Sequence, residues 1–89
     1  MRIVSRLNVF KKDYKRMASR GKNMKKLDAV LIDLSNDNVL DPKYRDHKLI
    51  GNFKTRRECH IEPDWLLIYR LEKNKLILER TGSHSDLFD

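Results

Sequence analysis

The apolar stretch at residues 65–71, with the sequence WLLIYRL, constrains the fold of this chain more than any other segment. Both of its alternating faces are apolar, which is typical of a strand that is buried on both sides in the interior of a sheet. Such a strand needs a neighbour along each edge. We therefore expect a small sheet with residues 65–71 at its centre.

The segments around this central run carry strand and turn signals. Residues 55–61 alternate in character, and residues 75–81 (KLILERT) follow a polar turn, so both segments predict strands. Upstream, LIGNF at 49–53 carries a Gly-Asn pair between apolar residues, which predicts a compact hairpin. The C-terminal half is therefore expected to be an antiparallel meander of three or four strands, followed by a short tail.

The N-terminal half predicts one strand and two helices. Residues 2–7 alternate in part, as in a short strand. Apolar residues then recur at helical spacing from Phe10 to Ala18 and from Met24 to Leu34, with Gly21 between the two segments. The predicted fold class is α+β: a strand followed by a two-helix hairpin packed on an antiparallel three- to four-stranded sheet. The whole chain, residues 1–89, is expected to form a single domain.

The basic residues are concentrated near the N-terminus. The first 27 residues hold ten Lys or Arg and one acid, whereas the rest hold ten basic and twelve acidic residues. This asymmetry predicts a polyanionic partner, either RNA, DNA or an acidic protein, although a basic helix face can also be merely solvated. No apolar run approaches the ~20 residues that span a bilayer, and no signal-peptide core is present. We expect a cytoplasmic protein that does not bind membranes.

All three histidines, His47, His60 and His84, lie in the C-terminal half, near the ends of expected strands. Their spacing matches no compact zinc motif, and there is no Gly-rich phosphate loop. A nucleophilic pair of Cys59 and His60 is disfavoured because neighbouring strand residues point to opposite faces. Acid–base chemistry on a phosphodiester remains, and we expect no metal or cofactor, although three scattered histidines and an acid could still ligate an ion.

These residue types suit RNA cleavage. RNA carries its own nucleophile, the 2′-OH, and histidine can accept or donate a proton near neutral pH. An arginine fork matches two phosphate oxygens, so Arg56, on the strand face of His60, and Arg80 are candidates for the phosphate. Trp65 could offer a stacking face to a splayed base.

Each candidate also has a purely structural interpretation. His60 can be a partly buried sheet residue, and His84 can be a solvated tail residue. Trp65 can belong to the core, Phe88 can plug the core from the tail, and Glu58 can serve only in an ion pair. The residue types leave both interpretations open.

Three separated blocks match one family in a single register: YRDHKLIGNFK (44–54), RRECHIEPDWLLIYRL (56–71) and LERTGSHSDLF (78–88). The chain resembles the YafQ branch of the RelE-type bacterial toxins, which are ribosome-dependent mRNA endonucleases. The resemblance is strong over about residues 41–88, and in the helical hairpin it is one of pattern more than of identity. It implies a toxin of a type II toxin–antitoxin system whose partners are a cognate antitoxin, the ribosome and mRNA, with no DNA binding by the toxin alone.

The resemblance implies that His47, His60 and His84 surround the scissile phosphate. We expect His60 and His84 to form the proton-transfer pair, with His47 and Arg56 at the phosphate. The expected reaction is metal-independent attack by the 2′-OH, which leaves a 2′,3′-cyclic phosphate and a 5′-OH.

The remaining implied roles concern acids, aromatics and docking charges. Asp64 is expected to be an orienting residue and not a proton donor or acceptor. Trp65 and Phe88 would contact or shape the base pocket. Close relatives often carry Asp where this chain has Glu58, so a proton-transfer role for Glu58 stays open beside an orienting one. The basic helices would dock on ribosomal RNA through Lys11, Lys12, Lys15, Arg16, Arg20, Lys22, Lys25 and Lys26.

Two rival functions remain. ParE-type relatives share the same architecture but poison gyrase by contact and are not enzymes. A plain RNA-binding module would use the basic helices alone. Three histidines favour the nuclease, because binding by itself does not require imidazoles.

Overall fold

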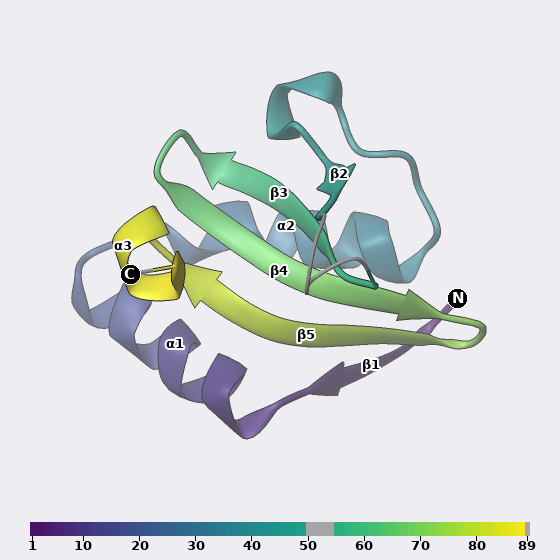
Figure 1. Cartoon of the computed structure of the whole chain (residues 1–89), viewed down its shortest axis with the longest axis horizontal. Coiled ribbons are helices and arrows are strands. Elements are labelled where there is room, and N and C mark those ends of the chain that lie inside the picture. The colour runs from purple at the N-terminus through teal and green to yellow at the C-terminus, as the bar shows by residue number, and fades with distance from the viewer. Residues whose placement is uncertain (50–54, 89) are drawn as a thin grey trace.

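The strands form one sheet with the doubly apolar segment at its centre (Figure 1). This computed structural model describes residues 1–49 and 55–88. In chain order the elements are β1 (Ile3–Arg6), α1 (Asn8–Ser19), α2 (Met24–Ser35), the 3₁₀ turn η1 (Pro42–Tyr44), β2 (His47–Lys48), β3 (Arg57–Glu62), β4 (Trp65–Glu72), β5 (Lys75–Gly82) and α3 (His84–Phe88). The sheet order is β1-β5-β4-β3-β2, with β1 parallel to β5 and the other neighbours antiparallel.

The α+β class and the order of strand, helical hairpin and meander are confirmed, and two details differ. The described sheet has five strands, because β1 adds to the meander as a parallel neighbour of β5. The expected tail folds into the short helix α3. The hairpin predicted at residues 49–53 lies, apart from Leu49, outside the described residues.

Helices α1 and α2 cover one face of the sheet and lie behind it in Figure 1. Their apolar residues recur at helical spacing and meet every second residue of the central strands. Asn23 caps α2 by accepting a hydrogen bond from the Lys25 backbone N–H at 3.2 Å. No helix in the described ranges is long and apolar enough to cross a membrane. The main residues of this core are Phe10, Met17, Leu27, Val30, Leu34, Trp65, Leu67, Tyr69, Leu76 and Leu78.

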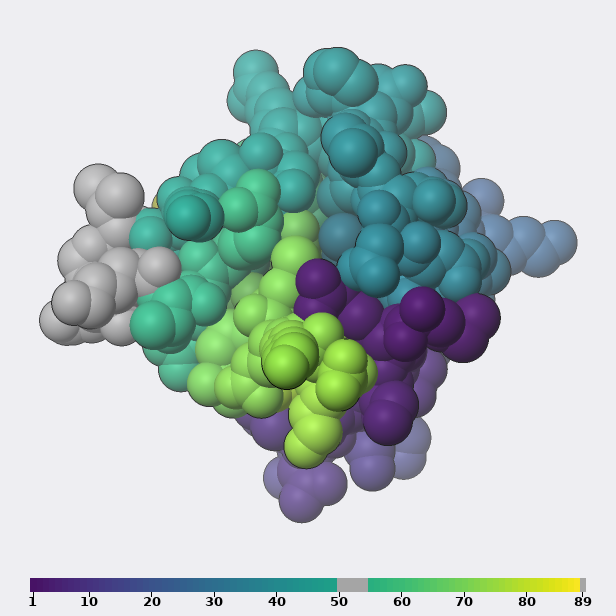
Figure 2. All heavy atoms as spheres, turned by 90° about the vertical axis from the view of Figure 1, so that its right-hand side faces the viewer, coloured from purple at the N-terminus to yellow at the C-terminus, as the bar shows by residue number. Residues whose placement is uncertain are grey.

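The start of the chain is held against the β4–β5 turn. The Arg2 guanidinium donates to Asp37 at 2.6 Å and to the backbone carbonyl of Glu72, and the Ile3 N–H donates to the Asn74 carbonyl at 2.8 Å. Figure 2 shows the purple N-terminal residues packed beside the light-green turn. These bonds place β1 along β5.

The opposite face of the sheet carries an apolar patch and a charged network. Leu66, Ile68 and Ile77 are buried there, because they alternate with residues of the helix-side core. Glu79 is also buried and forms ion pairs with Arg56 and, at 2.8 Å, with the Nε of Arg70. A β-bulge in β5 leaves Glu79 between the residues that face Ile68 and Tyr69. The ion pairs of Glu79 therefore join β5 to Arg70 of β4 and to Arg56, which precedes β3.

A buried carboxylate joins α1 to β5. Asp13 is only 2% exposed and accepts hydrogen bonds from Arg16 at 2.8 Å, from Arg80 at 2.7 and 3.2 Å, and from the Thr81 N–H at 3.2 Å. Four donors on one carboxylate satisfy a charge that would otherwise be costly to bury.

We expect Asp13→Asn to destabilise the fold. The amide cannot neutralise Arg80, and one of its two polar atoms would be a donor facing other donors. Because Arg80 is about a third exposed, the expected loss is roughly 2–3 kcal/mol, below the ~3–5 kcal/mol typical of a fully buried pair. Urea unfolding measures it, with Asp28→Asn, an exposed carboxylate of α2, as the matched control. Equal stability of the two variants would contradict the assigned role of Asp13.

Candidate active site

Two histidines converge on one buried carboxylate. The pairing of β2 with β3 sets His47 opposite Glu58, and His60 lies two residues further along the same face of β3. The Oε1 of Glu58 is 3.6 Å from the Nε2 of His47 and 3.3 Å from the Nε2 of His60. Glu58 is 7% exposed, and the two ring centroids are 6.4 Å apart. We call these three residues the histidine–glutamate cluster.

The other ring nitrogen of each histidine faces a backbone carbonyl. The Nδ1 of His47 is 2.6 Å from the carbonyl of Arg45, and the Nδ1 of His60 is 3.3 Å from that of Pro63. A carbonyl oxygen can only accept, so each Nδ1 carries the proton of that hydrogen bond. Both imidazoles therefore present Nε2 to Glu58, and the Nδ1 hydrogen bonds fix the orientation of the rings.

Strand β2 has only two residues, and a side-chain network secures the segment before it. Asp46 accepts from the Tyr69 hydroxyl and, at 2.9 Å, from the Arg57 guanidinium. Burial and the carboxylate of Asp46 raise the pKa of Tyr69, so the hydroxyl stays a donor. His47 is thus held next to β3 by its immediate neighbour in the chain.

His84 reaches the same end of the sheet through the backbone. Its N–H donates to the Asp64 carboxylate at 2.9 Å, and Asp64 directly follows Pro63, whose carbonyl accepts from His60. The ring of His84 packs against Phe88, with 4.9 Å between centroids. Within the described residues, the histidine–glutamate cluster holds two of the three histidines, and His84 lies beside it through Asp64.

Helix α3, which carries His84 and Phe88, is fastened by Asp86. Asp86 accepts two hydrogen bonds from Arg20 of α1, at 2.6 and 3.0 Å, and one from the Ser83 N–H at 2.9 Å. The Asp86 N–H in turn donates to the Ser83 hydroxyl, which completes a capping box. A Cβ at Gly82 would lie 2.9 Å from Asp86, so glycine makes this close approach possible.

The position of Trp65 contradicts the expectation that its ring stacks on a base. Its ring is fully buried on the helix side, and its Nε1–H donates to the Thr81 hydroxyl at 3.0 Å. A buried ring offers no face to a base, so in this structure Trp65 is a core residue. Lys22 lies 5.9 Å from the centroid of this ring. Cys59 is likewise buried, which raises the pKa of its thiol and separates it from His60 on the other face.

The two arginines expected at the phosphate are bound to carboxylates of the fold. Arg56 pairs with Glu79, and Arg80 pairs with Asp13. Each side chain keeps about a third of its surface exposed (33% and 32%). Their observed role is therefore structural, and any phosphate contact would have to use the outer nitrogen atoms.

The basic residues of the helices separate into two groups. Lys11, Lys12 and Lys15 are exposed on α1, which packs on β5. Lys22 and Lys26 share the carboxylate of Glu62, at 3.1 and 3.0 Å. Arg16 is bound to Asp13. The exposed lysines of α1 therefore form a surface of their own, on a different element from the histidine–glutamate cluster.

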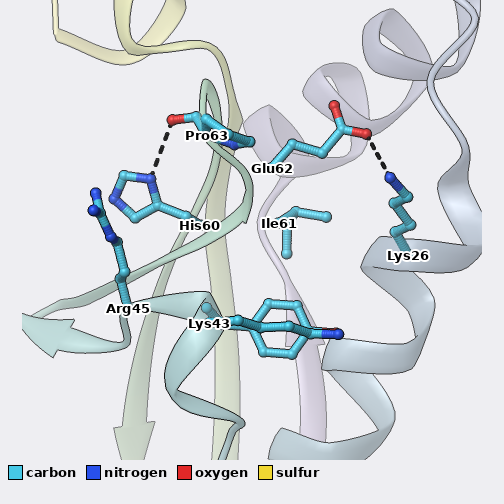
Figure 3. Close-up of a pocket in the computed structure, with 8 residues that line it drawn as sticks. Lys26, Lys43, Arg45, His60, Ile61, Glu62 and Pro63 are labelled. Atoms are coloured by element: carbon cyan, nitrogen blue, oxygen red, sulfur yellow. Dashed lines mark hydrogen bonds and ion pairs between the residues drawn. The ribbon is translucent and has the colours of Figure 1, made fainter.

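Sequence reasoning missed a basic pocket beside His60 (Figure 3). We use this name for the hollow of about 450 Å³ lined by Lys26, Lys43, Arg45 and His60, among others. Residues 43–45 sit in a turn, where charge carries no periodic signal. The one available clue was their position directly before His47. Among the described residues, no three His, Cys, Asp or Glu are grouped so as to hold a metal ion.

Comparison with known proteins assigns the fold to bacterial toxins of type II toxin–antitoxin systems. The chain belongs to the YafQ family: the model described as "Bacterial toxin of type II toxin-antitoxin system, YafQ" matches residues 2–89. The family expected from the three sequence blocks is thereby confirmed.

Three relatives illustrate the similarity. The mRNA interferase toxin YafQ of Escherichia coli K12 is 44% identical over 80 residues, which cover 89% of this chain and 87% of that protein. A copper-bound mutant toxin from Helicobacter pylori superposes with a TM-score of 0.95 at 40% identity, covering 99% of this chain and 100% of that one. The toxin of the E. coli DinJ-YafQ complex gives 0.92 at 40% identity, with both chains fully covered.

The attachment of α3 should depend on pH through Asp86. The Arg20 guanidinium and the Ser83 N–H hold the pKa of Asp86 well below its usual range. A depressed folded-state pKa gives stability that is fully present above the unfolded value of ~3.9 and is lost as the pH falls below it. Wild type should therefore melt above Asp86→Asn near neutral pH, and the difference should shrink below about pH 4. A difference that stays constant between about pH 7 and pH 3 would show that the charge of Asp86 does not hold α3.

Proposed function

We propose that this chain is a ribosome-dependent endoribonuclease that cleaves mRNA by metal-independent acid–base catalysis. The observation that carries the proposal is the histidine–glutamate cluster, in which two imidazoles with fixed Nδ1–H bonds turn Nε2 toward the Glu58 carboxylate. Membership of the YafQ family and a relative named as an mRNA interferase support the same reaction class.

The reaction follows from the chemistry of RNA. A base removes the proton of the 2′-OH, the 2′-oxygen bonds to phosphorus, and the P–O5′ bond breaks as an acid protonates the leaving oxygen. The products are a 2′,3′-cyclic phosphate and a 5′-OH. His60 and His84 supply the two proton transfers, and His47 contacts the phosphate. Each positioned acid or base contributes typically 10²–10⁴ in rate.

The two acids near the histidines act by positioning. Glu58 is buried between His47 and His60, so it orients both rings and can balance the charge of an imidazolium formed during the reaction. Asp64 binds the backbone of His84 and fixes the start of α3. Phe88 packs on the His84 ring and shapes the wall on which a base would rest.

The ribosome supplies the alignment of the substrate. The exposed lysines of α1 dock on ribosomal RNA in the cytoplasm, and the ribosome presents mRNA with its 2′-OH in line. Orientation alone can contribute several kcal/mol, so free RNA is cut poorly. Until the toxin is released, a cognate antitoxin covers the lysine surface of α1 with an acidic segment that folds on binding. A crystal structure of an E. coli DinJ-YafQ complex supports the expectation of a protein partner.

His60→Ala and His84→Ala should each lower the cleavage rate by roughly 10²–10⁴ while the protein stays folded. Primer extension on translated mRNA after induction measures the cuts, and circular dichroism verifies the fold. Lys73→Ala, in the β4–β5 turn at the other end of β4, is the matched control and should cut as wild type does.

The rival functions predict different outcomes for growth arrest and for the cuts in mRNA. A toxin that acts by binding alone would still arrest growth after both histidines are replaced. A simple RNA-binding module would produce no cuts at all. Cuts that persist when translation is blocked would contradict the ribosome dependence but leave the nuclease intact.

A further inference from the structure

The basic pocket opens between α2, η1 and the turn that follows β3, and His60 forms part of its wall (Figure 3). Lys43 and Arg45 are exposed, and they enter from the segment that also leads into His47. Two positively charged side chains and an imidazole around a hollow are groups that can bind a phosphate.

Charge within this pocket is divided between two sides. Glu62 is the carboxylate among the described lining residues, and its ion pairs with Lys22 and Lys26 lower its pKa, so it stays ionised. In Figure 3 this pair lies across the hollow from Arg45 and His60. Within residues 1–49 and 55–88, neither Lys43 nor Arg45 forms an ion pair with a carboxylate. Arg45 lies next to His60, and the Lys43 ammonium lies over the Tyr44 ring, 5.1 Å from its centroid (Figure 3).

The backbone of Arg45 supports a functional role for this side. Arg45 has a φ of 52°, in the left-handed region that favours glycine or asparagine. Such a conformation is uncommon in a residue with a Cβ, and here it ends η1 and turns the chain toward His47. The same residue gives its carbonyl to the Nδ1 of His47, so its position is coupled to the histidine–glutamate cluster.

We propose that the basic pocket is a second RNA subsite, which binds the phosphodiester next to the scissile one through Lys43 and Arg45. The inference rests on the proposed function. His60 belongs to both places, since its Nε2 faces Glu58 while its ring lines the pocket. An RNA strand that crosses His60 therefore has one phosphate at the histidines and its neighbour in the pocket. Because the pocket shares a wall with the cleavage site, RNA fits it better than an acidic peptide does.

The test uses short RNA with a 2′-O-methyl group at the cleavage position, which removes the nucleophile and allows binding to be measured without cleavage. Lys43→Gln should weaken binding several-fold and reduce the slope of log K against log salt by about 0.7, the value for one phosphate contact on a single strand. Lys75→Gln, an equally exposed lysine at the start of β5, is the matched control and should change neither quantity.

A neutral methylphosphonate, placed at one linkage at a time, locates the contact. At one linkage adjacent to the scissile position it should weaken wild type and have no further effect on Lys43→Gln. If the affinity lost through the methylphosphonate and the affinity lost through Lys43→Gln combine independently at every linkage, Lys43 contacts no particular phosphate, and the proposed subsite is wrong. A Glu-rich peptide that binds wild type better than RNA does, and loses binding in Lys43→Gln, would also overturn the RNA assignment.

The test of the subsite can be distinguished from the test of the proposed nuclease activity. Coupling at one linkage without cuts in translated mRNA would sustain the subsite on a protein that binds RNA but does not cleave it. Cuts without any coupling would remove the subsite and leave the nuclease in place.

Discussion

The carboxylate of Asp13 is the interaction on which the rest of the structure depends. It brings together a helix residue, a strand side chain and a strand N–H, so it fixes how α1 lies on β5. The strand continues through Gly82 into α3, where Asp86 binds Arg20, the C-cap residue of α1. In a chain of 89 residues the apolar core is small, so such polar anchors carry much of the specificity of packing. The position of His84 therefore depends on two carboxylates: Asp13 joins α1 to β5, and Asp86 joins α3 to the end of α1.

Glu58, on β3, is a second acid that groups from other parts of the chain surround. Both acids are buried, but their partners differ in kind. Asp13 binds arginines and a backbone N–H, whereas Glu58 faces two imidazoles, the side chains that most often serve as general acids and bases. A buried acid therefore joins two elements in one place and lies between two imidazoles in the other.

The sequence predicted the elements better than it predicted their partners. The alternation at residues 55–61 and the doubly apolar run correctly gave β3 and β4, because those patterns reflect burial directly. The parallel pairing of β1 with β5 was not predicted, since it depends on Arg2 reaching the β4–β5 turn rather than on any pattern within β1. Helix α3 was missed although its capping box, Ser83 and Asp86, has the spacing of a helix start; its five residues are too few for an apolar period to appear. Trp65 was open to either interpretation, and the hydroxyl of Thr81 decides for the core.

The net charge of +7 has a different meaning once the ion pairs are known. Arg2, Arg16, Arg20, Lys22 and Lys26 of the basic N-terminal third are bound to acids from other parts of the described chain or from α1 itself. Much of the apparent excess therefore stabilises the fold. The charge that remains at the surface is divided between the lysines of α1 and the Lys43–Arg45 side of the basic pocket. The first group can attract a large polyanion over a distance of about a Debye length, ~8–10 Å at physiological salt, whereas the second is next to His60. Under the proposed function, long-range attraction and local alignment of RNA therefore fall to separate elements, and each can change without disturbing the other.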